Sequence, residues 1–414
     1  MGNIPPSVLR QPPPPPGRGG SKDGSQTTEV NQPISEMIRH NPVSNNLRSR
    51  PYYFRSCKKM RPTDISSLPD EIVFKILLHL PAQDIFNVAR LVCPQWYRMI
   101  HSIDFIHEHL HRSPPGLLIQ NIEDKTAQRS PIFACVDRGQ IEISKLDYKF
   151  RDAVWTSCHG LILEGDLKAR FTIIAANPAT KQHFSVPTHE YHIDDRWHTG
   201  LGYAPASMEY KVVHTFDSDF YVLTLGVDDV WRRVECGHLT RSAQKLLSRS
   251  TPLVTEGYMH WVHPEKNLVV MLDLETEAFR QLRCPPGKKR ANCGFLVGDS
   301  LTCFTMRGWF SWGVWELRPG TGEWKKLPGI ELGGRAQELE NLCGKKGCDC
   351  DWGLSVVGWI KYKEVLVFRV SCPSRVCIAY SIRTGELRAF ELDCEGNKHN
   401  YLPHRSSLVW LGGT

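Results

Sequence analysis

The sequence predicts an α+β multidomain chain with two folded parts, a short helical module over residues 64–113 and a larger all-β domain over residues 115–414. Two observations carry this prediction. Apolar residues between Ser66 and Ser113 recur at helical spacing, whereas the chain beyond Leu117 consists of short β-branched and aromatic runs between turn residues. A chain of 414 residues also exceeds one typical domain, so more than one folded unit is expected.

Residues 1–63 precede both parts, and we expect them to form a disordered, Pro/Gly-rich basic tail. This segment holds ten Lys or Arg and three Asp or Glu, so it accounts for the whole net charge of +7. The remaining residues carry 41 charges of each sign and give no indication of a nucleic-acid partner. We interpret the basic cluster of the tail as a solvated linker, with a nuclear-import signal or a nucleic-acid contact as alternatives; it comprises Arg48, Arg50, Arg55, Lys58, Lys59 and Arg61.

Three amphipathic helices are predicted in the helical module. The first begins after Ser67, whose hydroxyl could cap it, and ends before Pro81, with a stripe formed by Ile72, Ile76 and Leu80. The other two begin near Gln83 and at Pro94, and the stripes expected on them are Ile85, Val88, Ala89 and Val92, and Trp96, Ile100 and Ile103. Helices of about ten residues are unstable alone, so the three must pack together or against a partner.

These helices resemble the F-box family. The matching motifs are Leu68-Pro69-Asp70-Glu71, Ile76-Leu77-Leu78-His79-Leu80-Pro81, Val92-Cys93-Pro94-Gln95-Trp96, and Phe105 with His107 and His109. Pro94 departs from the family, which more often has Lys or Arg there. The resemblance implies docking onto a Skp-type adaptor, and through it onto a cullin-RING complex. The adaptor-binding residues that it implies are Leu68, Pro69, Ile72, Ile76, Leu80 and Trp96.

A repeated unit organises the all-β domain. Strand–turn–strand segments begin at Phe171, Tyr221, Leu268, Trp312 and Val376. Their turns follow one another at intervals of 45–64 residues, and a four-stranded propeller blade takes about 40–50 residues. We therefore expect a β-propeller of about six blades, with five or seven as alternatives. Residues 117–150 would supply another blade, the strand beginning at Ser406 would close the ring, and residues 331–350 would form an inserted loop.

This domain is similar to the F-box-associated domain that follows the F-box in large plant families. The matching segments are Ser157–Ile162, Asn177–Thr180, Gly202-Tyr203, Tyr210–Val213, Trp231-Arg232, Gly257–Trp261 and Asp273–Phe279. The resemblance implies a domain that recognises target proteins, sometimes glycoproteins. Neither WD-repeat nor kelch-repeat signatures recur at the period.

Candidate reactive groups are few. Cys158-His159 does not fit a nucleophile–base pair, because neighbouring strand residues point to opposite faces; we expect a strand residue and an exposed neighbour. Zinc binding by Cys343, Cys348 and Cys350 would need a fourth ligand from Cys372, Cys377, Cys394 or His404, and we favour an unliganded loop. We expect no cofactor.

Three further groups are given structural interpretations. His107, His109 and His111 are expected at a solvated helix end, and the tryptophans 309, 312, 315, 352 and 359 are interpreted as blade packing, with a binding site as the alternative. The acidic pairs are interpreted as turn formers; they comprise Asp194, Asp195, Asp217, Asp219, Asp228 and Asp229.

The function predicted from the sequence is therefore a non-catalytic substrate receptor of an SCF-type cullin-RING ubiquitin ligase. Its target would be an unidentified protein, bound by loops at one end of the propeller. A non-degradative adaptor-bound scaffold and a carbohydrate- or glycoprotein-binding propeller are the alternatives. No signal peptide or apolar run of membrane-spanning length is found, so we expect a cytoplasmic or nuclear protein.

Overall fold

The computed structural model describes residues 68–122, 131–137, 139–151, 153–166, 172–187, 198–216, 219–286, 293–343, 353–371, 375–392 and 399–409. All of them belong to one compact unit, Asp64–Thr414. The expected tail over residues 1–63, with its basic cluster, lies outside the described residues. No described helix is both long enough and apolar enough to cross a membrane.

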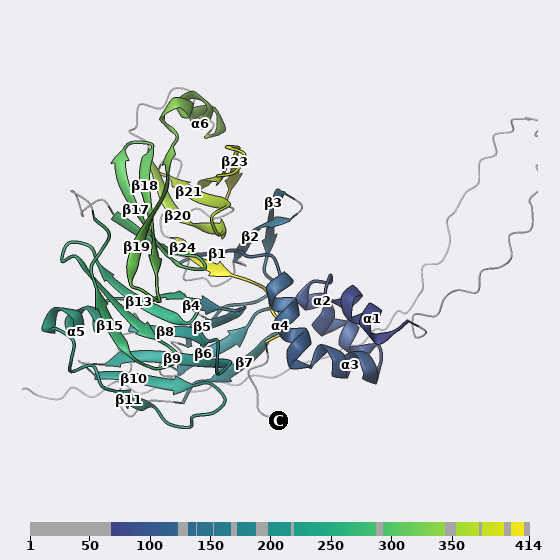
Figure 1. Ribbon diagram of the computed structural model, residues 1–414. Coiled ribbons are helices and arrows are strands. Elements are labelled where there is room, and N and C mark those ends of the chain that lie inside the picture. Colours follow the sequence, from purple (N-terminus) through teal and green to yellow (C-terminus); the bar gives the residue numbers. More distant parts are fainter. Residues whose placement is uncertain are drawn as a thin grey trace, which may run out of the picture. The chain divides into compact units, whose positions relative to one another are not determined.

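Four α-helices and a 3-10 turn form the N-terminal helical domain (Figure 1). They are α1 (Asp70–Leu77), α2 (Ala82–Asn87), the 3-10 turn (Ala89–Leu91), α3 (Pro94–Ile100) and α4 (Ile103–Arg112). The starts of the three expected helices are confirmed within two residues. The expected third helix, however, is divided in two, because the hydroxyl of Ser102 caps α4 by accepting a hydrogen bond from the Phe105 N–H.

The rest of the described chain forms six four-stranded sheets, so the prediction of about six propeller blades is confirmed. Blade 1 contains β24 (His399–His404), β1 (Gly116–Asn121), β2 (Ile132–Asp137) and β3 (Gln140–Lys145). Blade 2 contains β4 (Val154–Cys158), β5 (Leu161–Asp166), β6 (Thr172–Asn177) and β7 (Gln182–Ser185). Blade 3 contains β8 (Thr199–Ala204), β9 (Glu209–Phe216), β10 (Asp219–Thr224) and β11 (Arg232–Val234).

Blades 4 to 6 follow the same order along the chain. Blade 4 contains β12 (Leu253–Thr255), β13 (Tyr258–His263), β14 (Leu268–Asp273) and β15 (Phe279–Leu282). Blade 5 contains β16 (Cys293–Val297), β17 (Leu301–Gly308), β18 (Ser311–Arg318) and β19 (Glu323–Glu331). Blade 6 contains β20 (Leu354–Lys361), β21 (Val365–Val370), β22 (Val376–Ser381) and β23 (Leu387–Glu391). Each of the five repeats seen in the sequence is the third and fourth strand of a blade.

The ring closes through β24, which pairs antiparallel with β1 from His404 opposite Gly116 to His399 opposite Asn121. The expectation that the closing strand begins at Ser406 is wrong. Residues 405–409 leave the sheet instead, because Asn177 Nδ2 donates hydrogen bonds to the carbonyl oxygens of Ser407 and Val409, both at 3.0 Å. Closure of the ring by a C-terminal strand is confirmed, but the closing strand is His399–His404, which precedes Ser406 in the sequence.

Two short helices interrupt the strand pattern. Helix α5 (Arg241–Leu247) lies where the sequence suggested helical periodicity, between blades 3 and 4. Helix α6 (Ala336–Leu342) lies within the segment expected to be an inserted loop, between blades 5 and 6. Leu339 is the buried side chain of α6, and one buried apolar residue in seven gives too little periodicity to reveal the helix in the sequence.

Neighbouring strands in each blade are antiparallel, so the loops that join them lie alternately at two opposite ends of the blade. We call the end with the turns between first and second and between third and fourth strands the turn face; β1 starts and β24 ends there, next to the helical domain. We call the opposite end, with the remaining loops and the links between blades, the connection face. Helix α5 belongs to the connection face, and in Figure 1 it lies at the left edge while α1 to α4 lie at the right.

Apolar side chains between neighbouring blades form the cores of the ring. Between blades 3 and 4, for example, Phe220 packs edge-on against Trp261 and Phe279, with ring centroids 5.6 and 4.8 Å apart. Each sheet is apolar on both faces and is covered by its neighbours. These cores hold neighbouring blades of the ring together.

Candidate functional site: the exposed apolar face of the helical domain

Helix α1 has one buried and one exposed apolar side. Val73 and Leu77 are 4% and 0% exposed, whereas Ile72 and Ile76 are both 42% exposed. Leu80, in the turn after the helix, is 37% exposed. Because residues four apart lie on one side of a helix, the three exposed residues form an apolar stripe in contact with solvent.

The start of α1 differs from the expectation in one detail. Pro69 occupies the N-cap position, and no side chain makes a capping hydrogen bond there. The residue expected to cap the helix, Ser67, is therefore not the N-cap residue, and it lies outside the described residues. Asp70 and Glu71 in the first turn are favourable because the helix dipole is positive at that end. Pro69 is exposed and extends the apolar stripe beyond the helix.

The six residues predicted to bind an adaptor separate into two groups. Pro69, Ile72, Ile76 and Leu80 are exposed. Leu68 and Trp96 are only partly exposed and pack against the core of the helical domain. These two residues therefore support the stripe from its edge.

Further exposed apolar residues were missed by the sequence analysis. Val88, Leu91 and Val92 are 64%, 69% and 54% exposed, and Tyr97 and Ile103 are 46% and 63% exposed. The expectation that Val88 and Val92 lie on one helix face with Ile85 and Ala89 is wrong, because α2 ends at Asn87: Ile85 and Ala89 are buried, whereas Val88 and Val92 are exposed. Ile103 begins α4 and does not continue the stripe of α3. The motif Val92-Cys93-x-x-Trp96 was the sequence signal that could have marked this region.

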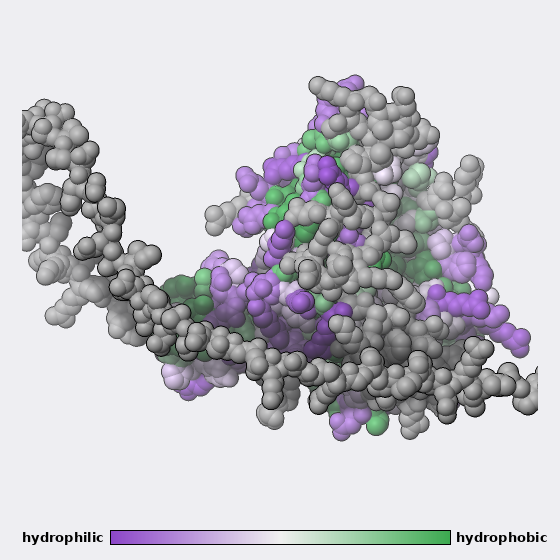
Figure 2. All heavy atoms as spheres, turned by 180° about the vertical axis from the view of Figure 1, so that it is seen from behind, coloured by the Kyte–Doolittle hydropathy of each residue, from purple (hydrophilic) through white to green (hydrophobic). Residues whose placement is uncertain are grey.

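The two exposed sets belong to one continuous region of the helical domain. Gln95 Nε2 donates a hydrogen bond to Asp70 Oδ1 and so holds the start of α3 beside the start of α1. Pro69 is next to Asp70 and Val92 lies just before α3, so the α1 stripe adjoins the 3-10 turn. Figure 2 shows hydrophobic surface (green) at the end of the molecule formed by these helices.

The propeller supports the helical domain from the opposite side. The buried core of the helices includes two propeller residues, Ala179 from the turn after β6 and Leu408 from the C-terminal segment. Phe105 of α4, which is fully buried, packs edge-on against Phe74 with ring centroids 5.1 Å apart. The domain therefore buries one face against the ring and leaves the other exposed.

Comparisons with known proteins identify both parts of the chain. The sequence model of the F-box-like family matches residues 65–113, and that of the F-box-associated β-propeller domain matches residues 119–297. The chain carries an F-box followed by an F-box-associated propeller.

Curated relatives agree with this assignment. "Putative F-box only protein 15" from Arabidopsis thaliana is 26% identical over 253 residues, which cover 57% of this chain and 64% of that protein. "F-box protein CPR1" from the same plant is 25% identical over 277 residues, which cover 55% of this chain and 62% of that protein. The chain thus spans a little under two thirds of the length of these relatives.

Of the three histidines of F-box helix α4, His111 is exposed, as expected of a solvated helix end, whereas His107 and His109 are not. His109 is 2% exposed, and its Nε2 lies 3.0 Å from the carbonyl oxygen of Leu80. Burial lowers the pKa of His109, so its neutral form is favoured. His107 is partly buried and packs against Tyr203 of the propeller, with ring centroids 6.4 Å apart. These contacts fix the end of α4 to α1 and to blade 3.

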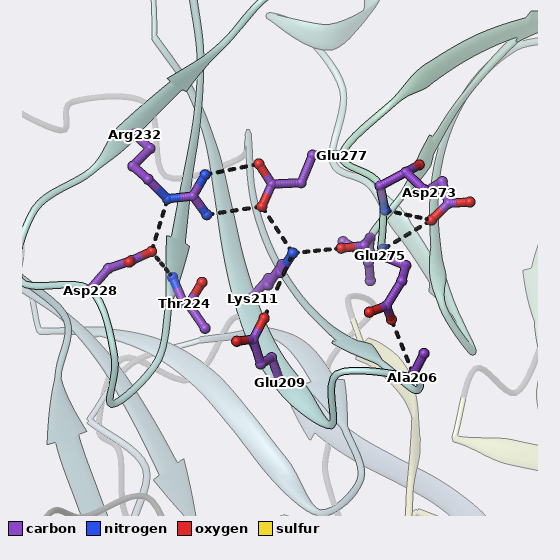
Figure 3. A network of polar contacts seen from close by, with 11 residues as sticks. Ala206, Glu209, Lys211, Thr224, Asp228, Arg232, Asp273, Glu275 and Glu277 are labelled. Carbon is purple, nitrogen blue, oxygen red and sulfur yellow. Dashed lines mark hydrogen bonds and ion pairs between the residues drawn. The ribbon is translucent and has the colours of Figure 1, made fainter.

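Three family motifs of the propeller meet in a single polar network between blades 3 and 4 (Figure 3). Lys211, which is 5% exposed, donates to the Leu274 carbonyl oxygen at 2.8 Å and to Glu277 Oε1 at 2.9 Å. Arg232 holds both oxygens of Glu277, at 2.9 and 3.0 Å, and also contacts Asp228. The hydrogen bond from Arg232 lowers the pKa of Glu277, and the Glu277 carboxylate pairs with the buried Lys211 ammonium. These three motifs therefore join blade 3 to blade 4.

The candidate reactive groups have structural roles. Burial raises the pKa of the Cys158 thiol, so it is a poor nucleophile. The expectation of an exposed His159 is wrong: its Nε2 lies 3.0 Å from Glu256, and its ring packs on Tyr203 at 4.6 Å. Burial alone would raise the pKa of Glu256, but the hydrogen bond from His159 and the electrostatic influence of His159, His111 and Arg405 together lower it. Asp228 accepts a hydrogen bond from Thr224 N–H, as expected of a turn former.

The remaining candidates are only partly described. Trp312 and Trp359 are buried between blades 5 and 6, as blade packing predicts, whereas Trp309 is 68% exposed. Within the described residues no group of three His, Cys, Asp or Glu could hold a metal ion. Cys343 is buried, whereas Cys348, Cys350, Cys372, Cys394, Trp352, Asp194, Asp195 and Asp217 lie outside the described residues.

Proposed function

We propose that this chain is a substrate receptor of an SCF-type cullin-RING ubiquitin ligase. The supporting observation is the exposed apolar stripe of Ile72, Ile76 and Leu80 on an F-box whose other face is fixed to the propeller. A Skp-type adaptor covers this stripe, with Leu68, Pro69 and Trp96 at its edge. The chain contributes binding and proximity, and catalysis belongs to the ubiquitin-conjugating enzyme of the complex.

The target binds at the connection face of the propeller. This face points away from the F-box and carries α5, α6 and the exposed Trp309 of the turn after β17. Long connections on a rigid ring are the usual place for recognition, because they vary without disturbing the sheets. The chain acts in the cytoplasm or nucleus, which a fluorescent fusion would test.

The adaptor contact is tested by capture of a purified Skp-type adaptor on the full chain. Truncation of an apolar side chain that becomes buried costs about 1.5–3 kcal/mol, so Ile72→Ala with Ile76→Ala should weaken capture by at least tenfold, as should Leu68→Ala with Pro69→Ala. The matched control is Val227→Ala with Val230→Ala, which removes apolar side chains that are 67% and 71% exposed on the propeller. Unchanged capture by both F-box variants would overturn the proposal.

Two alternatives use the same fold. A non-degradative scaffold would bind adaptor and target without turnover, so its bound proteins would not accumulate when the proteasome is inhibited. A carbohydrate-binding propeller would lose its partner after enzymatic deglycosylation. Accumulation of glycan-independent partners on proteasome inhibition supports the ligase receptor against both.

A further inference from the structure

The two faces of the propeller carry opposite charge. The described loops and links of the connection face hold nine Lys or Arg (149, 151, 241, 245, 249, 266, 283, 335 and 375) against five Asp or Glu (147, 235, 265, 338 and 340). The described turns of the turn face hold three Lys or Arg (181, 363 and 383) against eight Asp or Glu (228, 229, 256, 275, 277, 299, 364 and 386). Among the described residues, the face that points away from the F-box is therefore the basic one.

Helix α5 holds the densest basic group on that face. Arg241 and Lys245 lie one turn apart on α5, and Arg249 follows the end of the helix. All three side chains are exposed, and none of them has an ion pair with a described residue. Other exposed arginines differ in this respect; Arg233, for example, is 2.6 Å from Asp219.

The base of α5 is firmly held, so the three cations are presented on a fixed support. Ala243, Leu246 and Leu247 are 0%, 4% and 1% exposed and belong to the core between blades 3 and 4. Thr240 caps the helix by accepting from the Ala243 N–H and donates to Gln281 Oε1 at 3.1 Å. Because the helix that carries the three cations is already fixed, no backbone entropy is lost when they bind an anion.

We propose that α5 is the docking point for an acidic, extended segment of the target protein; this inference rests on the proposed receptor function. A rise of 1.5 Å per residue separates Arg241 and Lys245 by about 6 Å along the helix axis. Alternate residues of an extended chain are about 6.6–6.8 Å apart. Asp or Glu at every second position would thus face successive cations of α5.

Two other anionic partners fit less well. The folded part of the chain after residue 63 carries 41 charges of each sign, and its acidic turn face would repel a long nucleic acid. A helix that lies on a membrane exposes apolar residues, whereas the apolar side chains of α5 are buried. A short acidic peptide needs only the small patch that α5 offers.

The test measures fluorescence anisotropy of a labelled twelve-residue peptide of alternating Glu and Ser, titrated with the full chain. Reversal of the three charges in Arg241→Glu, Lys245→Glu, Arg249→Glu should weaken binding by at least about tenfold, because each exposed ion pair contributes little and three are lost together. The matched control is Arg318→Glu, Lys326→Glu, Arg383→Glu, which reverses three exposed charges elsewhere and leaves the basic tail unchanged. Control binding should change less than twofold.

Further arms separate the alternative outcomes. A Gln-Ser peptide of the same length should bind at least tenfold more weakly than the Glu-Ser peptide. Equal weakening by both triple variants, or by neither, would overturn the proposal. If single-stranded DNA or phosphatidylserine vesicles bound more tightly than the Glu-Ser peptide, and lost binding in the same triple variant, the partner of α5 would be a nucleic acid or a membrane and the proposal of an acidic peptide would be wrong. The α5 variant should still capture the adaptor, because its substitutions lie far from the F-box. If the unmodified chain failed to capture the adaptor, that result would contradict the receptor function and not the binding of acidic peptides by α5.

Discussion

At the scale of single residues, buried histidines are the least expected feature of the propeller. His260 and His404 are 1% and 5% exposed, and burial lowers their pKa values to about 3 and about 4. Thr255 and Ser157 hydroxyls lie 2.9 and 2.8 Å from their rings. Both histidines therefore have to be neutral in the folded protein.

These histidines make stability depend on pH. Because their folded pKa values lie below the ordinary value of 6.5, the unfolded chain binds more protons, and stability falls as the pH drops below 6.5. Two such groups should cost about 3 kcal/mol between pH 6.5 and 5, because the slope reaches about 1.4 kcal/mol per group and pH unit only once the unfolded histidines are fully protonated. Urea unfolding across this interval measures the loss.

Histidines and carboxylates affect the free energy of unfolding in different pH ranges. Glu277, whose pKa is lowered first by Arg232, loses its contribution only below its ordinary value of 4.5. His404→Asn should therefore reduce the slope between pH 6.5 and 5, to which His260 and His109 still contribute, while it leaves the acid limb in place. A free energy of unfolding that stays constant from pH 7 to 5 would contradict the assignment.

At the scale of elements, the C-terminal segment 405–409 joins the F-box to the propeller. Leu408 is 5% exposed in the F-box core, and the amide of Asn177 binds two carbonyl groups of the segment. Gly160, with φ +83°, lets the segment pass, because a Cβ there would lie 2.3 Å from the Ser407 hydroxyl. The segment therefore fills the space between the two domains.

Deletion of residues 405–414 should lower the free energy of unfolding by about 3–5 kcal/mol. Burial of Leu408 contributes about 2 kcal/mol, and the unsatisfied Asn177 amide costs about 1–3 kcal/mol. Thermal and urea unfolding measure the effect, with deletion of residues 410–414 as the control. Equal stability of the two truncated chains would show that the segment does not join the domains.

At the scale of the whole molecule, sequence periodicity predicted the blade number because each repeat is a local strand–turn–strand unit. The run from Ser406 to Val409 was misassigned, because its apolar residues resemble a strand although Leu408 inserts into the F-box. Local patterns do not reveal which distant surface takes up an apolar side chain.

Long-range polar contacts were also beyond the sequence. Lys211, Arg232 and Glu277 come from three separate motifs, and only the arrangement of blades 3 and 4 brings them together. The exposed face of α1 was predictable from spacing, whereas the exposed Val88, Leu91 and Val92 depend on where α2 ends. The sequence therefore predicted the first half of the candidate site and missed the second.

The central claim is that the apolar stripe of the F-box is covered by an adaptor. Hydroxyl-radical footprinting of the full chain, with and without a purified Skp-type adaptor, measures this directly for Ile72, Ile76 and Leu80. We predict that their labelling falls severalfold in the complex, while labelling of Val227 and Val230 on the propeller stays constant. Adaptor binding that leaves the three F-box residues as reactive as in the free chain would contradict the account.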